Sequence, residues 1–472
     1  MYNPTNQYRC TIIRGKSQTD MENFLPLYAN MVHTICPCEE AHFKSAARKM
    51  LSNAIFSIAD YDSLTSSHQK TVNNHLTEIA GTLMGLYYPK YEDDGNVYIY
   101  ESEACKFLVE NNDYPIFFQN LCLNFQFPNG AKWMDFIQED IANNINIKPF
   151  CYVVSLLYYA QQQPTPTLLS KQEIGYYVLN NLDVLQGKVP CKDVYDRIIK
   201  DREQGVRREA LTGSRDWQHI KEQFNLLELA NIVETDSTYI WLNKQESYAI
   251  SIFLKRLEEP GFDCYKYDLT NTSSHKEYIA DWKEYYGKFN QSLLVLSSNV
   301  VEIIDKEKLS IGTPSMESTV DLGDRGEALV YKMEQDRVRA YKPRLVNKVL
   351  LLGKTKGLGY DISSIEADEN PQKPEFARYI EVKSTKRITK PSFDKHWFDS
   401  LNLTAKEWIA AEQYGDYYNI YRVYFTKQET IVVRINNPFS KASAGLLEVY
   451  PTMYQMNFGS EVIDKTICLQ VD

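Results

Sequence analysis

An acid and an amine stand two positions apart near the C-terminal end of the chain, in the segment Tyr379-Ile380-Glu381-Val382-Lys383. A β-strand alternates its faces, so Glu381 and Lys383 would point the same way while Ile380 and Val382 point into a core. One strand would therefore present an anion and a cation side by side.

A second acid, Asp361, precedes Glu381 by twenty residues and stands between Tyr360 and Ile362, an apolar context suited to an adjacent strand. Pairing of the two strands would bring the carboxylates together. Two carboxylates repel unless they share a cation, and hard oxygen ligands with open positions select Mg²⁺ or Mn²⁺. Such a metal would activate water beside a phosphate, while Lys383 would position or help deprotonate that water and offset negative charge.

A third acid, Glu327, lies in Gly323-Asp324-Arg325-Gly326-Glu327, which we expect to open a helix that continues through Asp336. Glu327 would then lie in the first helical turn. One interpretation is that its charge complements the helix dipole; the other is that it reaches the metal directly or through water. The predicted catalytic residues are Glu327, Asp361, Glu381 and Lys383, with the three acids as metal ligands.

A further acid, Glu407, follows Thr404 at the spacing of a capping box. In that motif the two side chains bond each other's backbone N–H groups and start a helix. Capping is therefore the role that we predict for Glu407.

Four ordered motifs resemble the C-terminal domain of NO VEIN proteins: Gly-Asp-Arg-Gly-Glu at 323–327, Gly-Tyr-Asp-Ile at 359–362, Tyr-Ile-Glu-Val-Lys at 379–383, and the segment 403–423. That domain is similar to the PD-(D/E)xK, or restriction-endonuclease-like, nucleases. The resemblance implies Asp361 and Glu381 as metal ligands, Lys383 as the catalytic lysine and Glu327 as an accessory acid. It also implies phosphodiester hydrolysis that leaves a 5′ phosphate and a 3′ hydroxyl.

Length and composition limit the classes of function. A chain of 472 residues that is 43% hydrophobic predicts two or three domains, and a net charge of −10 argues against a protein that coats nucleic acid non-specifically. The chain has nine scattered cysteines and no apolar run long enough to span a membrane, which indicates a cytoplasmic protein with reduced thiols. A zinc site is an alternative for one cluster, although its Cys-x-Cys spacing is not that of a common zinc knuckle: His33, Cys36, Cys38 and His42.

The front half contains a weak repeat of helix, hairpin and helix, with predicted strands at 96–100 and 238–242. This order is that of the end of a winged-helix unit, whose preceding helix can enter the major groove. The alternative is an α-rich scaffold without a reading role. The residues that we predict to contact DNA, unless they form ordinary solvated faces, are Lys70, Asn73, Arg207, Arg208, Arg215 and Gln218, with Lys386 and Arg387 behind the catalytic segment.

The segment Leu169-Ser170-Lys171-Gln172-Glu173 has capping-box spacing and resembles a helix start in the recognition part of FokI- and AlwI-type restriction enzymes. We therefore predict an α+β multidomain protein, with a mostly helical, winged-helix-containing N-terminal region and a C-terminal α/β restriction-endonuclease-like core. The predicted boundaries are 1–150 and 151–265 for two recognition subdomains, 266–315 for a connector, and 316–472 for the nuclease.

The predicted function is Mg²⁺-dependent, site-specific cleavage of double-stranded DNA, as in type II restriction enzymes. A homodimer would let two sites cut both strands, and a separate companion methyltransferase would protect host DNA. Two alternatives are a modification-dependent or phage-defence nuclease and a non-catalytic DNA-binding protein with a degenerate nuclease fold. The chain has no Gly-Lys-Ser/Thr phosphate loop for ATP-driven movement.

Overall fold

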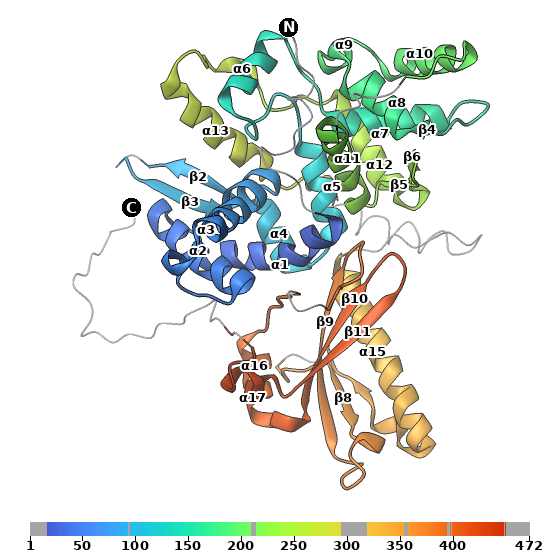
Figure 1. The fold of residues 1–472 in the computed structure, drawn as a ribbon. Helices are drawn as coiled ribbons and strands as arrows, with labels where there is room; N and C mark the ends of the chain where they lie inside the picture. Colours follow the sequence, from blue (N-terminus) through green and yellow to red (C-terminus); the bar gives the residue numbers. More distant parts are fainter. Residues whose placement is uncertain are drawn as a thin grey trace, which may run out of the picture.

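A computed structural model describes residues 17–92, 95–208, 214–293, 319–353, 357–393, 397, 399–447 and 449. These residues form a larger, mostly helical N-terminal region and a smaller C-terminal domain built on one sheet (Figure 1). The predicted mixture of helices and sheets is therefore confirmed. The breaker-rich junction at 312–315 lies outside the described residues. No helix in the described ranges has both the length and the apolar composition needed to cross a membrane.

The longer helices of the N-terminal region are α1 (Gln18–Ile35), α2 (Glu40–Phe56), α3 (Ser66–Asn73), the π-helix Asn74–Leu83, α4 (Glu103–Asn111), α5 (Tyr114–Asn124), α6 (Met134–Ala142), α7 (Pro149–Gln161), α10 (Cys191–Glu203), α11 (Ser214–Leu229), α12 (Ser247–Glu258) and α13 (Thr272–Tyr286). Between α7 and α10 lie the short helices α8 (Lys171–Ile174) and α9 (Leu182–Leu185) and the π-helical turn Gly175–Leu179. Ser170 and Glu173 form the capping box that their spacing predicts, at the start of α8.

Two small sheets interrupt these helices, in the strand orders β1-β3-β2 and β4-β6-β5. Their strands are β1 (Cys38–Glu39), β2 (Tyr87–Tyr91), β3 (Val97–Glu101), β4 (Leu169–Ser170), β5 (Val233–Thr235) and β6 (Tyr239–Leu242). The hairpin β2–β3 lies between the π-helix and α4, and β5–β6 lies between α11 and α12. Both predicted hairpins therefore form, each with a helix before and after it.

Helix α13 belongs to the N-terminal core, although its sequence reads as a connector. Trp282 and Tyr286 are buried in that core and stack with their ring centroids 5.3 Å apart. The Tyr286 hydroxyl donates to the carbonyl of Leu83 at 2.8 Å. The packed part of the N-terminal region therefore includes much of the segment between 266 and 286.

The C-terminal domain contains a five-stranded sheet in the order β11-β10-β9-β8-β7. Its strands are β7 (Leu350–Leu351), β8 (Ile362–Ile365), β9 (Ala377–Lys386), β10 (Tyr418–Phe425) and β11 (Thr430–Asn436). Strand β9 pairs parallel with β10, and the other neighbours are antiparallel. Helix α15 (Thr319–Tyr341) lies on one side of the sheet, and α16 (Ala405–Tyr414) and α17 (Pro438–Ser443) lie on the other (Figure 1).

The two faces of β9 have different surroundings, as alternation along the strand predicts. Ile380 and Val382 pack with Val330 of α15 in one buried cluster. On the opposite face, Tyr379 packs against a second cluster that includes Ala411 of α16 and Tyr418 of β10. Glu381 and Lys383 therefore share the α16 side of the sheet.

The C-terminal end of β9 docks into the N-terminal region. The Asn112 carbonyl, just after α4, accepts from the Thr385 hydroxyl at 2.9 Å and from the Lys386 N–H at 3.1 Å. Glu22 of α1 is fully buried and accepts from the N–H groups of Ile388 and Thr389, each at 2.7 Å. Burial raises the pKa of Glu22. The nearby Arg387 and these N–H groups favour the charged carboxylate and oppose that rise without cancelling it.

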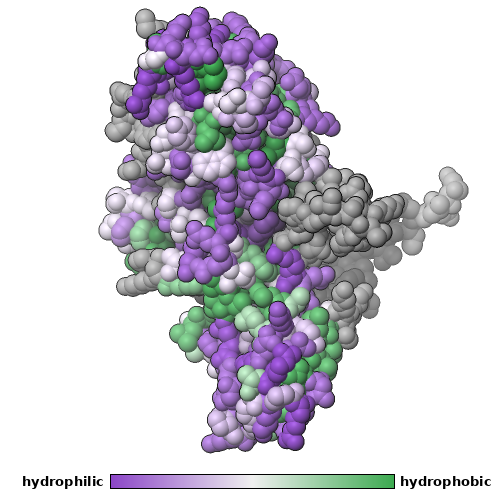
Figure 2. Space-filling view, turned by 90° about the vertical axis from the view of Figure 1, so that its right-hand side faces the viewer, coloured by the Kyte–Doolittle hydropathy of each residue, from purple (hydrophilic) through white to green (hydrophobic). Residues whose placement is uncertain are grey.

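The side chain of Arg387 lies in this joint. It is 3% exposed, approaches the Glu22 carboxylate at 3.5 Å and donates to the Asn23 side chain at 2.8 Å. In the space-filling view, apolar residues gather where the larger and smaller parts of the molecule meet (Figure 2). Strand β9 and the N-terminal region thus share a joint that is polar at Glu22 and apolar around it.

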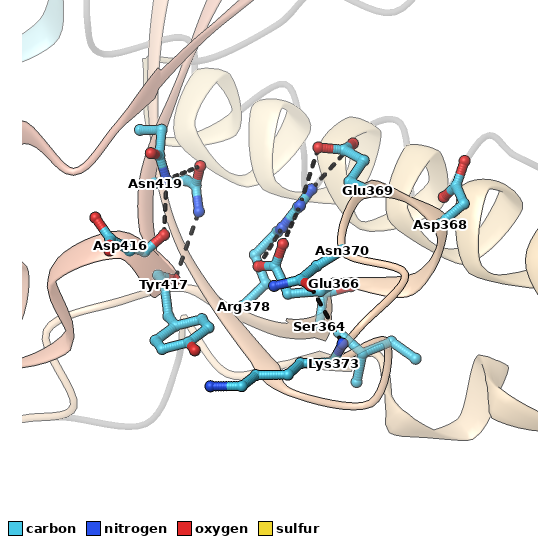
Figure 3. A network of polar contacts seen from close by, with 12 residues as sticks. Ser364, Glu366, Asp368, Glu369, Asn370, Lys373, Arg378, Asp416, Tyr417 and Asn419 are labelled. Carbon is cyan, nitrogen blue, oxygen red and sulfur yellow. Dashed lines mark hydrogen bonds and ion pairs between the residues drawn. The ribbon is translucent and has the colours of Figure 1, made fainter.

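A network of charges around the buried Arg378 fixes the other end of β9 (Figure 3). The Arg378 guanidinium donates to Glu366 at 2.8 Å and to Glu369 at 3.0 Å, and Arg434 also pairs with Glu369. Burial alone would raise the pKa of Glu369, but the two arginines outweigh burial and lower this pKa to about 2. Acids and arginines therefore balance at this end of the sheet.

We predict that Arg378→Ala lowers the free energy of unfolding of the C-terminal domain by about 3–5 kcal/mol, because it leaves two carboxylates without their buried partner. Lys348→Ala is the control, since the Lys348–Glu375 pair is exposed and should contribute less than about 1 kcal/mol. Calorimetric unfolding of both variants measures the difference. Equal losses would contradict a structural role for the buried network.

Candidate active site

Asp361, the residue just before β8, lies beside Glu381 of the antiparallel neighbour β9. The ladder between β8 and β9 ends at the pair Ile362 and Ile380, and the two acids are the next residues outward. The Asp361 N–H donates to the Ile380 carbonyl at 2.9 Å, and the Val382 N–H donates to the Asp361 carboxylate at 2.8 Å. The predicted approach of these two acids is what the register of β8 and β9 produces.

The carboxyl groups of the buried Glu381 and the half-buried Asp361 lie against each other. Burial, together with the neighbouring carboxylates of Asp361 and Glu407, raises the pKa of Glu381 to about 9 against the opposing effect of Lys383. Burial also raises the pKa of Asp361, and a side-chain hydrogen bond with Glu381 acts in the opposite direction. Without a cation, the pair therefore retains a proton near neutral pH.

Lys383 extends from the same face of β9 as Glu381. Its ammonium nitrogen lies 2.7 Å from Glu381 Oε1 and 3.0 Å from Glu407 Oε2. Burial alone would lower the pKa of Lys383, but the two carboxylates outweigh burial and the net shift is upward. Lys383 is therefore held as a cation in this arrangement.

Glu407 reaches the site from α16. The predicted capping box is present, since the Thr404 N–H donates to Glu407 Oε2 at 2.9 Å and the Glu407 N–H donates to the Thr404 hydroxyl at 3.3 Å. The same Oε2 also faces Lys383. Capping spacing predicts the helix start, but nothing in that spacing indicates which strand the helix start packs against.

Glu327 lies on α15, and its predicted place in the helix was wrong. The helix begins at Thr319, so Glu327 lies in its third turn and is not in a position to complement the helix N-terminus. Its carboxylate fills the space beside Gly353, where an added Cβ would lie 2.2 Å from Glu327 Oε2. The structure thus places this acid on the α15 side of the sheet, near the turn that follows β7.

The donor set at Asp361 and Glu381 fits a divalent cation of the Mg²⁺ type. Both side chains offer hard oxygen atoms, and their mutual repulsion is what a shared cation would relieve. Within the described ranges, no group of three or more His, Cys, Asp or Glu side chains is arranged to hold a metal ion. At the Cys-Pro-Cys turn, His33 instead contacts Glu101 at 2.9 Å.

The predicted DNA-contacting residues of the first unit occupy different environments. Lys70 is exposed on α3. The side chain of Asn73 accepts from Arg48 at 2.9 Å, so it already has a partner within the fold. Lys386 and Arg387 lie at the joint between the two parts of the chain.

The basic residues before α11 lie on the surface where the structure describes them. Arg207 and Arg208 are exposed, and Arg208 pairs with Asp201 at 3.0 Å. Arg215 and Gln218 lie in the first turns of α11, and their side chains are outside the described residues. The structure therefore does not bring the predicted DNA contacts into one described cluster.

We predict that Glu381→Gln stabilises the metal-free C-terminal domain by about 1–3 kcal/mol at pH 7.5. The folded pKa of Glu381 is raised from 4.5 to about 9, so its favourable contribution is complete below pH 4.5 and is lost as pH rises toward 9. The glutamine variant avoids that loss, and its advantage should vanish near pH 4.5. Unfolding in EDTA across this range measures the effect.

The control for this measurement is Glu412→Gln, which changes an exposed acid on the same helix as Glu407. Its stability should stay within about 0.5 kcal/mol of the wild type at each pH. A Glu381→Gln domain no more stable than the wild type at pH 7.5 would refute the electrostatic cost assigned to Glu381.

Comparisons with known proteins divide the chain at the same place as the fold. Residues 326–435 match the family described as protein NO VEIN, C-terminal, which confirms the resemblance of this part. Residues 2–283 match restriction endonuclease BpuJI, N terminal. No curated protein matches the chain.

A solved structure covers the same N-terminal part. The BpuJ1 endonuclease binding domain, crystallised in complex with pyrene- and phenanthrene-modified DNA, is 38% identical, with a TM-score of 0.53. The match covers 61% of this chain and 100% of that domain. Since the family match spans more than half of the sequence, the chain belongs to the restriction endonuclease BpuJI N-terminal family.

Proposed function

We propose that this chain is a restriction-type endonuclease that binds double-stranded DNA through its N-terminal region and hydrolyses it in its C-terminal domain. The observation that carries the proposal is the pair Asp361 and Glu381 on adjoining strands, with Lys383 on the same face. Family membership supports the DNA-binding part, because a 38% identical domain is described in complex with DNA. The match of residues 326–435 to the NO VEIN C-terminal family supports the hydrolytic part through the likeness of that domain to restriction-endonuclease-like nucleases, which the sequence motifs imply.

The N-terminal region would read DNA through its two helix–hairpin–helix units, which we propose to be winged helices. The hairpins β2–β3 and β5–β6 follow the π-helix and α11, and these helices are candidates for the major groove. Exposed Lys70, Arg207 and Arg208 would contact the phosphate backbone. A net charge of −10 means that such contacts must be local.

Asp361 and Glu381 would hold a Mg²⁺ ion, which Mn²⁺ could replace. When bound, this ion would supply an acidic water and a charge opposite the phosphate. The Val382 N–H fixes the orientation of the Asp361 carboxylate, and burial excludes bulk water from Glu381. Lys383, held as a cation, would stabilise the added negative charge on the phosphate in the transition state.

A homodimer would place two such sites on the two strands of a duplex, and a separate methyltransferase would protect the host sequence. A nuclease that requires modified bases, as in phage defence, would use the same catalytic residues and differ in what the N-terminal region accepts. Cleavage of unmodified and methylated plasmid by the same preparation separates the two substrate classes. End sequencing of the products then gives the recognition and cut positions.

We predict that the full-length protein cuts plasmid DNA with Mg²⁺ and not in EDTA, and that Lys383→Ala lowers the cleavage rate by at least about 100-fold. Lys348→Ala is the control, because that exposed lysine pairs with the exposed Glu375 and with no residue of the candidate site. Band shifts in EDTA should show equal DNA binding for all three proteins. Metal-independent DNA binding without cleavage of any tested DNA would instead identify a non-catalytic binding protein.

A further inference from the structure

Glu407 contacts the lysine of the site, and neither the metal pair nor the proposed chemistry gives it a role. The ammonium of Lys383 lies between Glu381 at 2.7 Å and Glu407 at 3.0 Å. The Glu407 side chain is 15% exposed, unlike a capping residue that faces only solvent. Helix α16 therefore contributes a partly buried carboxylate to the lysine of the site.

The fold fixes the start of α16 against the segment that leads into Asp361. Gly359 has φ +78°, and a Cβ there would lie 2.6 Å from the Lys406 carbonyl oxygen and 2.8 Å from Ala410 Cβ. The Tyr418 hydroxyl of β10 donates to the Gly359 carbonyl at 2.9 Å. A larger residue at 359 would push the helix away, so this close approach keeps Glu407 within reach of β9.

The Glu407 carboxylate has its own support within the helix cap. The Thr404 N–H binds the same Oε2 that faces Lys383, at 2.9 Å. Its position therefore does not depend on the ammonium group. Glu381, in contrast, faces both Lys383 and Asp361, and a metal ion bound by the two acids would draw on the oxygens that now contact the lysine.

We propose that Glu407 is a positioning residue that holds the Lys383 ammonium beside the reacting phosphate once the Glu381 carboxylate is engaged by a divalent cation. The inference rests on the proposed nuclease function and deepens it. A cation at Asp361 and Glu381 repels the ammonium and competes for its nearer partner. Glu407 supplies the second anion, fixed from another element, that keeps the amine in place.

The test compares Glu407→Gln, which keeps the side-chain length and an oxygen for the cap, with Thr404→Ala, which weakens the cap and keeps the carboxylate. We expect Glu407→Gln to lower kcat for Mg²⁺-dependent plasmid cleavage about 10–100-fold, with KM for DNA nearly unchanged. Thr404→Ala should keep kcat and lower the melting temperature by about 2–4 °C. If kcat falls in parallel with the melting temperature in both variants, Glu407 acts only as a helix cap and the proposal is wrong.

A double-mutant cycle establishes whether Glu407 acts through Lys383. In the Lys383→Ala background, Glu407→Gln should cause no further loss of residual activity, because the group that it positions is absent. Multiplicative losses would show that Glu407 acts independently of the lysine and would overturn the proposal. Wild-type kcat in the single Glu407→Gln variant would overturn it as well.

Metal binding is measured separately, by titration of each protein with Mn²⁺ in the absence of DNA. Glu407→Gln should bind Mn²⁺ within about twofold of the wild type, whereas Asp361→Asn should bind it at least about tenfold more weakly. Loss of Mn²⁺ binding in Glu407→Gln would make Glu407 a metal ligand and contradict the positioning role. A wild-type protein that binds Mn²⁺ and DNA but cuts no DNA would overturn the nuclease function itself, and the inference with it.

Discussion

The register between β8 and β9 is the constraint on which the site depends. Side chains alternate along a strand, so a slip of one residue would turn Glu381 and Lys383 toward α15 and expose Ile380 and Val382 to the α16 side. The apolar cluster under α15 opposes that slip, because it buries both of these aliphatic side chains. Packing on one face of the sheet thus determines the chemistry on the other.

Strand β9 also joins the two parts of the molecule. It carries the acid and the amine in its middle, and its C-terminal end pairs with Asn112 and precedes the residues that bind Glu22. A buried carboxylate that accepts several hydrogen bonds is costly to move, since each donor would lose its partner. The N-terminal region therefore holds a fixed relation to the strand that carries the site, only a few residues from Lys383.

The local sequence pattern was enough to predict how side chains are arranged along a strand. It failed where packing between distant segments determines the position of a residue. Alternation placed Glu381 and Lys383 on one face, and apolar flanks placed Asp361 on the next strand. The segment 323–327 was expected to open a helix, yet α15 begins at Thr319. Gly326 therefore lies inside the helix, where it allows close approach to Ser384.

Position along the chain also misled the interpretation of charge. Arg387 follows the segment of Glu381 and Lys383 and carries the charge that phosphates attract, but its neighbour in space is Glu22, distant in sequence. Glu407 shows the converse: its capping role could be predicted from Thr404, while its contact with Lys383 depends on how α16 packs on the sheet. Neither contact can be predicted from the spacing of residues nearby in the sequence.

The balance of charge differs between the network around Arg378 and the candidate site at Lys383. At one end of the sheet, Glu366 and Glu369 face two arginines, and the pKa of Glu369 falls to about 2. In the middle of β9, a single ammonium lies among the carboxylates of Asp361, Glu381 and Glu407, and the pKa of Glu381 rises to about 9. The first arrangement is complete as it stands, whereas the second has an excess of negative charge that a divalent cation would neutralise.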